Sequence, residues 1–140
     1  MSIFEDTAPR AVRHEPLRVA VLGASGSVGM QTLDVCRHFP QKVKVAALSV
    51  RSSVEFAVKA ANEFNCKYVA FADASVKGNA LLDSLPQGCK ASFGPEAVQA
   101  LAELDEVDCV VNAVVGEAGI YAGLAAVKAG KVLAYANKES

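Results

Sequence analysis

Residues 19–29 read Val-Ala-Val-Leu-Gly-Ala-Ser-Gly-Ser-Val-Gly: an apolar run that stops at Gly23, followed by two more glycines at steps of three. The pattern predicts a buried strand, a tight turn and a helix. Glycine lets a backbone approach another group closely, and the unpaired N–H groups of a helix N-terminus favour a phosphate. G-x-x-G-x-x-G is a spacing variant of the dinucleotide fingerprint. We therefore expect the turn from Gly23 to Gly29 to bind a pyrophosphate, with Ser25 and Ser27 adding hydroxyl donors. Gly29 is expected to pack helix on strand instead.

The remainder of the chain alternates between strand and helix patterns. Strands are predicted at 17–22, 43–50, 67–72, 89–93, 108–115 and 131–136, and helices at 27–39, 53–64, 74–85, 94–104 and 120–129. This order predicts a single α/β domain, a Rossmann-like, doubly wound, mostly parallel sheet with helices on both faces. We expect residues 1–16 to be a flexible leader and residues 17–140 to be the domain.

Ligands of such sheets bind beyond the carboxyl ends of the strands. Four segments follow strands there, and we expect them to converge: 23–29, 49–53, 113–119 and 136–140. Within the first helix, spacing places Val28, Thr32, Val35, Cys36 and Phe39 on one face.

The segment 49–53, Ser-Val-Arg-Ser-Ser, bears on the choice of dinucleotide. NAD-binding proteins usually place a carboxylate there for the ribose 2′-hydroxyl. This segment has none, and offers one guanidinium and three hydroxyls, which suit a 2′-phosphate. We therefore expect NADPH, bound by Arg51, Ser52 and Ser53. The alternative is that Arg51 is a solvated turn residue.

Two further stretches are candidates. Asn112 lies in an apolar strand, where its amide must be hydrogen-bonded, so it is expected to pin a neighbouring loop or to touch ligand. The small residues after it, including Ala113 and Val114, suit contact with a nicotinamide ring. Residues 137–139, Asn-Lys-Glu, follow the last strand on the same edge of the sheet.

Composition excludes several classes of protein. The 140 residues are 52% hydrophobic and carry a formal net charge of −1, which favours neither nucleic acid nor an anionic membrane as partner. No apolar run approaches the ~20 residues that span a bilayer. The four cysteines are expected to be buried, reduced thiols of a cytoplasmic protein. No His, Cys or carboxylate set has the spacing of metal ligands.

Four motifs together resemble the amino-terminal domain of 1-deoxy-D-xylulose 5-phosphate reductoisomerases. They are residues 23–35, 112–119 (Asn-Ala-Val-Val-Gly-Glu-Ala-Gly), 125–131 (Ala-Ala-Val-Lys-Ala-Gly-Lys) and 136–140 (Ala-Asn-Lys-Glu-Ser). The resemblance implies an enzyme that isomerises 1-deoxy-D-xylulose 5-phosphate and reduces it with NADPH to 2-C-methyl-D-erythritol 4-phosphate in non-mevalonate isoprenoid synthesis. It also implies a homodimer that uses Mg²⁺ or Mn²⁺.

The resemblance assigns roles to individual residues. It implies that Ser25, Gly26, Ser27 and Val28 hold the pyrophosphate. It also implies that Asn137 and Glu139 contact the cofactor and that Lys138 reaches the substrate, so that Lys138 and Glu139 are the catalytic candidates. The family usually has Gly, Lys or Arg, then Asn where this chain has Arg51-Ser52-Ser53, so the basic residue is displaced by one position.

The family's metal ligands, substrate-phosphate residues and most of its dimer interface lie beyond this last motif. We therefore expect the 140-residue chain to bind NADPH without turning over substrate. Two rival interpretations remain: a stand-alone NADP(H)-sensing domain, and the cofactor domain of a semialdehyde-dehydrogenase-type reductase.

Overall fold

A computed structural model describes residues 16–114, 122, 129–130 and 132–135. The helices and strands within them are β1 (Leu17–Leu22), α1 (Ser27–His38), β2 (Val43–Val50), α2 (Val54–Phe64), β3 (Tyr68–Phe71), η1 (Ala74–Gly78), η2 (Ala80–Ser84), β4 (Lys90–Phe93), α3 (Pro95–Leu101), β5 (Cys109–Asn112) and β6 (Val132–Tyr135). The predicted helix 120–129 lies outside the described residues except for Ala122 and Ala129.

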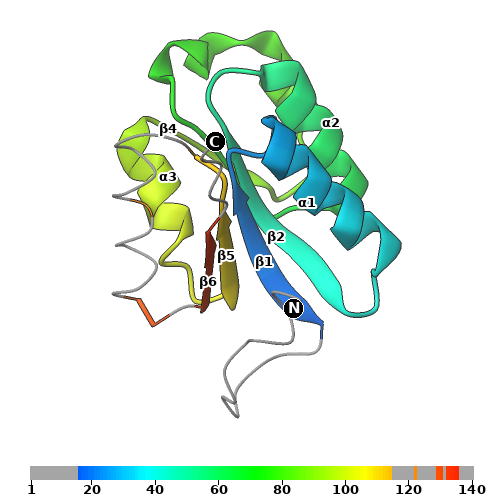
Figure 1. The fold of residues 1–140 in the computed structure, drawn as a ribbon. Coiled ribbons are helices and arrows are strands. Elements are labelled where there is room, and N and C mark those ends of the chain that lie inside the picture. The colour runs from blue at the N-terminus through cyan, green and yellow to red at the C-terminus, as the bar shows by residue number, and fades with distance from the viewer. Residues whose placement is uncertain (1–15, 115–121, 123–128, 131, 136–140) are drawn as a thin grey trace.

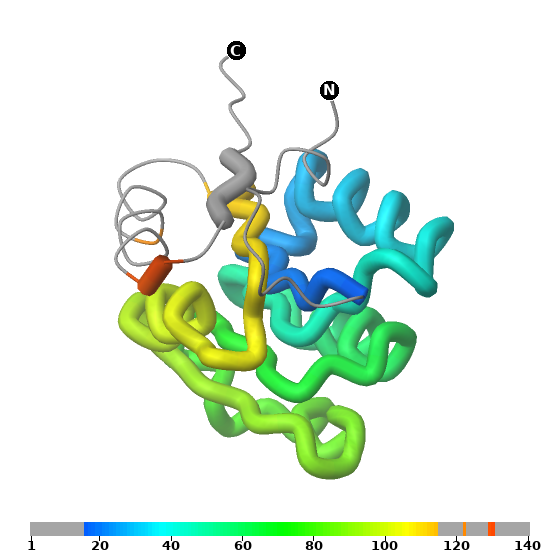
Figure 2. The backbone as a smooth tube through the Cα atoms, turned by 90° about the horizontal axis from the view of Figure 1, so that it is seen from below, coloured from blue at the N-terminus to red at the C-terminus, as the bar shows by residue number. Residues whose placement is uncertain are grey.

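The six strands form one sheet in the order β4-β3-β2-β1-β5-β6, and every neighbouring pair is parallel. The chain builds outward from β1 to β4 on one side, then returns to add β5 and β6 on the other. Strand order therefore reverses between β1 and β5, beside the glycine turn. Helices α1 and α2 cover one face and α3 the other (Figures 1 and 2). The predicted doubly wound fold is confirmed.

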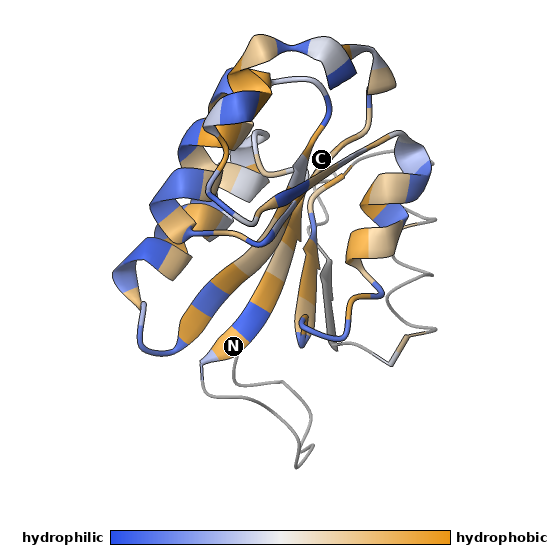
Figure 3. Ribbon diagram, turned by 180° about the vertical axis from the view of Figure 1, so that it is seen from behind, coloured by the Kyte–Doolittle hydropathy of each residue, from blue (hydrophilic) through white to orange (hydrophobic). Residues whose placement is uncertain are grey.

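Alternation along β1 divides the core between the two faces. Val19 and Val21 pack with residues of α1 and α2, whereas Ala20 and Leu22 pack with residues of α3. The α3 side of the sheet is lined with small side chains, which allow that helix to lie close to it. Figure 3 shows mainly hydrophobic residues along the central strands and hydrophilic ones on the outer sides of the helices.

Two ion pairs hold elements together away from the carboxyl edge. At the amino end of the sheet, the Arg18 guanidinium donates to both oxygens of Asp108, with Nε–Oδ2 at 3.0 Å and Nη2–Oδ1 at 2.9 Å. Between the helices, Arg37 of α1 donates through Nε and Nη2 to the Glu63 carboxylate of α2.

The predicted helix 74–85 is wrong. The segment forms two short 3-10 helices, because two side chains each begin a separate turn: Asp73 accepts from the backbone N–H of Ser75, and Asn79 accepts from that of Leu81. The second of these turns begins one residue after Gly78, where a helix is weakest.

The predicted inner face of α1 is partly wrong. Val35 and Phe39 are 42% and 51% exposed, and the buried residues are Gly29, Leu33 and Cys36. The helix is rotated toward its glycine because only a residue without a side chain fits against the turn beneath it.

Candidate functional site

The glycine turn leaves a helix N-terminus open at the carboxyl edge of the sheet. Gly23 follows β1 with φ +78°, a left-handed conformation that suits glycine, and its carbonyl accepts a 3.2 Å hydrogen bond from Gly26 N. Gly26 is the N-cap of α1, no side chain caps the helix, and its first turn holds no acidic residue. Both Gly26 and Ser27 are exposed. The first N–H groups of α1 can therefore donate to an anion.

Gly29 packs directly on this turn. A Cβ at Gly29 would lie 2.1 Å from the Gly23 carbonyl oxygen and 2.7 Å from Ala24 Cα. A Cβ at Gly26 would meet its nearest atom at 3.6 Å, an ordinary contact. The expectation that Gly29 permits close packing of helix on strand is therefore confirmed.

Three of the four post-strand segments meet at this turn. Ser49 of β2 accepts a 3.0 Å hydrogen bond from Gly23 N through its hydroxyl, and a 2.8 Å bond from Ala24 N through its carbonyl. From the other side, Ala113 N donates to Leu22 O at 2.9 Å. A Cβ at Gly23 would stand only 3.1 Å from the Ala113 carbonyl carbon. The fourth segment, 136–140, lies outside the described residues, and with it Asn137, Lys138 and Glu139.

Ser49 is therefore not one of the hydroxyls available to a phosphate. It is only 2% exposed, and its hydroxyl oxygen accepts a hydrogen bond from the turn after β1. Sequence reasoning counted it with Ser52 and Ser53 because all three follow one another closely. A hydroxyl in the otherwise apolar end of β2 was the one available signal of its structural role.

The segment after β2 offers an exposed polar surface. Arg51, Ser52 and Ser53 are all exposed, and Ser53 stands at the N-cap of α2 without a side-chain capping bond. Hydrogen bonds from Ser75, together with the charge of Arg51, lower the pKa of the Asp73 carboxyl below its usual value. The two residues are neighbours in the fold, since the backbone N–H of Asp73 donates to Arg51 O at 2.9 Å.

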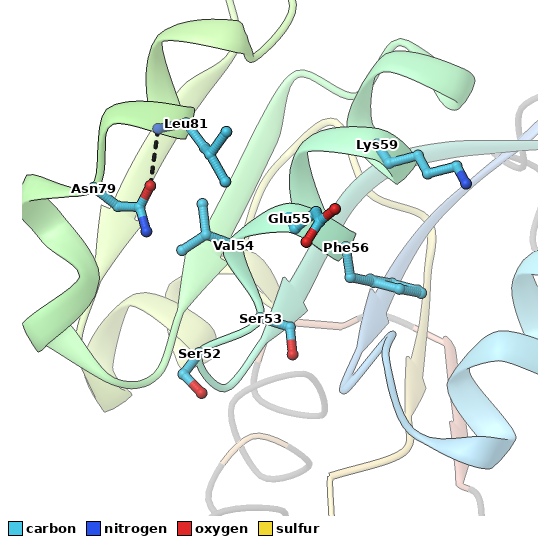
Figure 4. A pocket seen from close by; sticks show the side chains of 8 residues that line it. All are labelled: Ser52, Ser53, Val54, Glu55, Phe56, Lys59, Asn79 and Leu81. Carbon is cyan, nitrogen blue, oxygen red and sulfur yellow. Dashed lines mark hydrogen bonds between the residues drawn. The ribbon is translucent and has the colours of Figure 1, made fainter.

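A shallow pocket of about 580 Å³ opens beside this segment (Figure 4). The start of α2 and η2 supply its lining, which comprises Ser52, Ser53, Val54, Glu55, Phe56, Lys59, Asn79 and Leu81. Lys59 is a cation at this pocket that the sequence analysis did not single out. Its i, i+4 spacing from Glu55 on a helix was the only signal for it.

Asn112 shapes the loop that follows β5. It is 1% exposed, and its Oδ1 accepts a 3.2 Å hydrogen bond from Val114 N. This side-chain turn ends the strand at Asn112, three residues before the predicted end at Val115. The expectation that Asn112 pins a neighbouring loop is confirmed. Ala113 and Val114 are half-buried and lie beside the glycine turn, at the point where strand order reverses.

The described residues form neither a metal site nor a membrane-spanning helix. In the described part of the chain, no group of three His, Cys, Asp or Glu side chains could hold a metal ion. None of its helices has the length and apolar character needed to cross a membrane.

The comparisons with known proteins point to one family. The family model for 1-deoxy-D-xylulose 5-phosphate reductoisomerase matches residues 19–140. The reductoisomerase of Photorhabdus laumondii is 43% identical over 126 residues, covering 88% of this chain and 31% of the relative. That of Thermodesulfovibrio yellowstonii is 40% identical over 123 residues, covering 88% and 32%.

Solved structures of such enzymes share the fold. The Zymomonas mobilis reductoisomerase in complex with NADPH aligns with a TM-score of 0.81 at 37% identity, covering 90% of this chain and 33% of that one. A reductoisomerase in complex with NADPH, fosmidomycin and magnesium gives 0.74 at 32% identity, covering 84% and 29%. This chain thus spans about a third of the length of its relatives. Because the family model matches residues 19–140 and solved members share the fold, the chain belongs to the 1-deoxy-D-xylulose 5-phosphate reductoisomerase family.

Proposed function

We propose that residues 17–140 are the NADPH-binding domain of a 1-deoxy-D-xylulose 5-phosphate reductoisomerase. The observation that carries the proposal is that α1, behind the glycine turn, and α2, behind Ser53, both begin at one edge of the sheet, on the same face, without a side-chain cap. A dinucleotide with a 2′-phosphate brings two anionic groups to such an edge. The NADPH complex of the Zymomonas mobilis relative supports the same cofactor.

The residues present fit that cofactor. Ser25, Gly26, Ser27 and Val28 would hold the pyrophosphate, since Gly26 leaves room for close approach and no side chain caps the first turn. Figure 4 shows Ser52 and Ser53 at the pocket beside α2, where with Arg51 they would hold the 2′-phosphate.

At the other side of the turn, Ala113 and Val114 would line the nicotinamide, which supplies a hydride when NADPH is bound. Asn112 holds their backbone in place by its bond to Val114 N. The proposal keeps Asn137 and Glu139 as cofactor contacts, with Lys138 and Glu139 as catalytic candidates.

The activity of the complete enzyme is part of the same proposal. The complete enzyme would isomerise 1-deoxy-D-xylulose 5-phosphate and reduce the product to 2-C-methyl-D-erythritol 4-phosphate. It would be a cytoplasmic homodimer that uses Mg²⁺ or Mn²⁺. A relative solved with magnesium supports the metal. Because the chain spans about a third of its relatives, we propose that these 140 residues bind NADPH but do not catalyse the reaction. Oxidation of NADPH on addition of 1-deoxy-D-xylulose 5-phosphate and Mg²⁺ to the purified chain would refute this last point.

The choice of cofactor is tested by titrating the chain separately with NADPH and with NADH and measuring each affinity by calorimetry. Arg51→Ala should weaken NADPH by about 10- to 100-fold, the worth of a hydrogen bond between charged groups, and leave NADH nearly unchanged. Lys44→Ala is the matched control, because it removes an exposed cation near the opposite end of β2, the strand that Arg51 follows. Equal losses for both dinucleotides in Arg51→Ala would contradict the role of Arg51.

A further inference from the structure

One buried hydroxyl connects the two strands that end at the cofactor edge. Ser49 of β2 is 2% exposed and takes the N–H groups of two consecutive residues, Gly23 through its hydroxyl and Ala24 through its carbonyl. Both donors belong to the turn after β1. Among the described residues, the Gly23 N–H therefore has the Ser49 hydroxyl as its acceptor and no backbone carbonyl.

Described neighbours constrain the carbonyl, the Cα and the N–H of Gly23. The Gly23 carbonyl lies under Gly29, so close that even one methyl group there would collide with it. The Cα of Gly23 faces the backbone of Ala113 and Val114. The Ser49 hydroxyl holds the remaining group, the N–H, at 3.0 Å. A partly buried N–H that loses the acceptor described for it has to turn toward another one.

We propose that Ser49 is a positioning residue for the pyrophosphate-binding turn. By holding the Gly23 N–H, its hydroxyl sets the path of the chain from Gly23 to Gly26, and thereby the direction of the N–H groups that meet the cofactor. Ser49 acts through this backbone and contacts no phosphate itself. The inference rests on the proposed function, since it concerns the same dinucleotide site.

Ser49 also lies two residues before Arg51 in the same chain segment. One residue of β2 thus fixes the pyrophosphate turn, and the residues that follow it reach the 2′-phosphate. Removing the hydroxyl should affect the first subsite and spare the second. This separation distinguishes positioning of the turn from general damage to the fold.

The experiment compares Ser49→Thr with Ser49→Val. The two side chains have the same shape and both suit a strand, but only threonine keeps the hydroxyl. Each variant is titrated with NADPH and with adenosine 2′-monophosphate, which carries the 2′-phosphate and lacks the pyrophosphate. We expect Ser49→Val to bind NADPH about 5- to 30-fold more weakly than Ser49→Thr, the worth of one hydrogen bond. Both variants should bind adenosine 2′-monophosphate equally.

Three results would overturn the inference. The first is equal NADPH affinity in the two variants. The second is an equal loss of both ligands in Ser49→Val, which would indicate a merely structural role. In both cases the proposed function survives if the wild-type chain binds NADPH. The third is absence of NADPH binding by the wild-type chain, which would overturn the proposed function as well.

A second measurement covers the case in which Ser49→Val does not fold. In the wild-type chain, the Gly23 amide proton should exchange slowly with solvent because it is hydrogen-bonded to a buried oxygen. Its NMR resonance should also shift when NADPH is added. Fast exchange, or a resonance that NADPH leaves in place, would contradict the positioning role.

Discussion

Replacement of Gly29 by alanine tests how the glycine turn is built. The new Cβ would lie 2.1 Å from the Gly23 carbonyl oxygen and within 2.8 Å of two Ala24 backbone atoms. Ordinary contact begins at 3.4 Å, so the helix and the turn must separate by more than 1 Å. All three atoms belong to the backbone, and none can yield by a change of rotamer.

The size of the effect follows from two opposing terms. Overpacking a tight interior contact costs about 3 kcal/mol, whereas alanine in a helix is favoured over glycine by about 1 kcal/mol. The net loss of about 2 kcal/mol should lower Tm by roughly 6–10 °C in a chain of this size. Since the displaced atoms belong to the pyrophosphate turn, NADPH binding should weaken as well.

Urea and thermal unfolding of three alanine variants would measure this. Gly78→Ala is the control for stability, because nothing lies within 4 Å of a Cβ there. Gly26→Ala should fold normally, since its Cβ makes only a 3.6 Å contact, but should lose affinity for NADPH because the methyl group stands where the phosphate approaches. If Gly29→Ala unfolds at the same midpoint as Gly78→Ala, the packing argument is refuted.

Three further predictions concern the rest of the described structure. Asp108→Asn should destabilise the fold by about 1–3 kcal/mol, because it weakens the paired hydrogen bonds from Arg18; an unchanged urea midpoint would contradict this. A hydrogen bond from Arg37 lowers the pKa of Glu63 below its ordinary 4.5, so its contribution to stability is present above pH 4.5 and is lost as pH falls through the folded-state pKa. Glu63→Gln should therefore reduce the loss of stability between pH 6 and 3, which urea midpoints at the two pH values would show, and an unaltered pH dependence would count against it. Burial raises the pKa of all four thiols, and those of Cys36, Cys66 and Cys109 reach about 11 or 12. Because Cys89 alone of the four is only half-buried, a thiol reagent at pH 8 should label it first; labelling of native Cys89→Ser as fast as the wild-type chain would refute that order.

Much of the fold was predictable because its signals are local. The strands at 17–22 and 43–50 begin and end where the apolar runs do, and Gly94-Pro95 opens α3 as expected. The errors in where elements begin and end arose where side chains bond to backbone. Asn79 starts a new turn and Asn112 ends a strand, and neither effect is visible in hydrophobic periodicity.

Prediction of the site was limited in another way. Sequence position indicated correctly that segments 23–29 and 49–53 and residues 113 and 114 meet, because parallel strands bring their carboxyl ends together. It could not indicate which polar groups face ligand and which face the protein. Ser49 and Ser52 are the same residue type three positions apart, yet one is buried against Gly23 and the other exposed at the pocket.

The strand order also has a consequence for synthesis of the chain on the ribosome. Strands β1 to β4 can pair in sequence as they emerge, but the other edge of β1 pairs with β5, which begins at Cys109, 87 residues after Leu22. At about 5–20 residues per second, β5 follows β1 by roughly 4–17 seconds. During that interval β1 presents an apolar edge of the kind that recruits strands from other chains. The same late strand carries Ala113 to the glycine turn, so the turn is completed only when the aggregation-prone edge is closed.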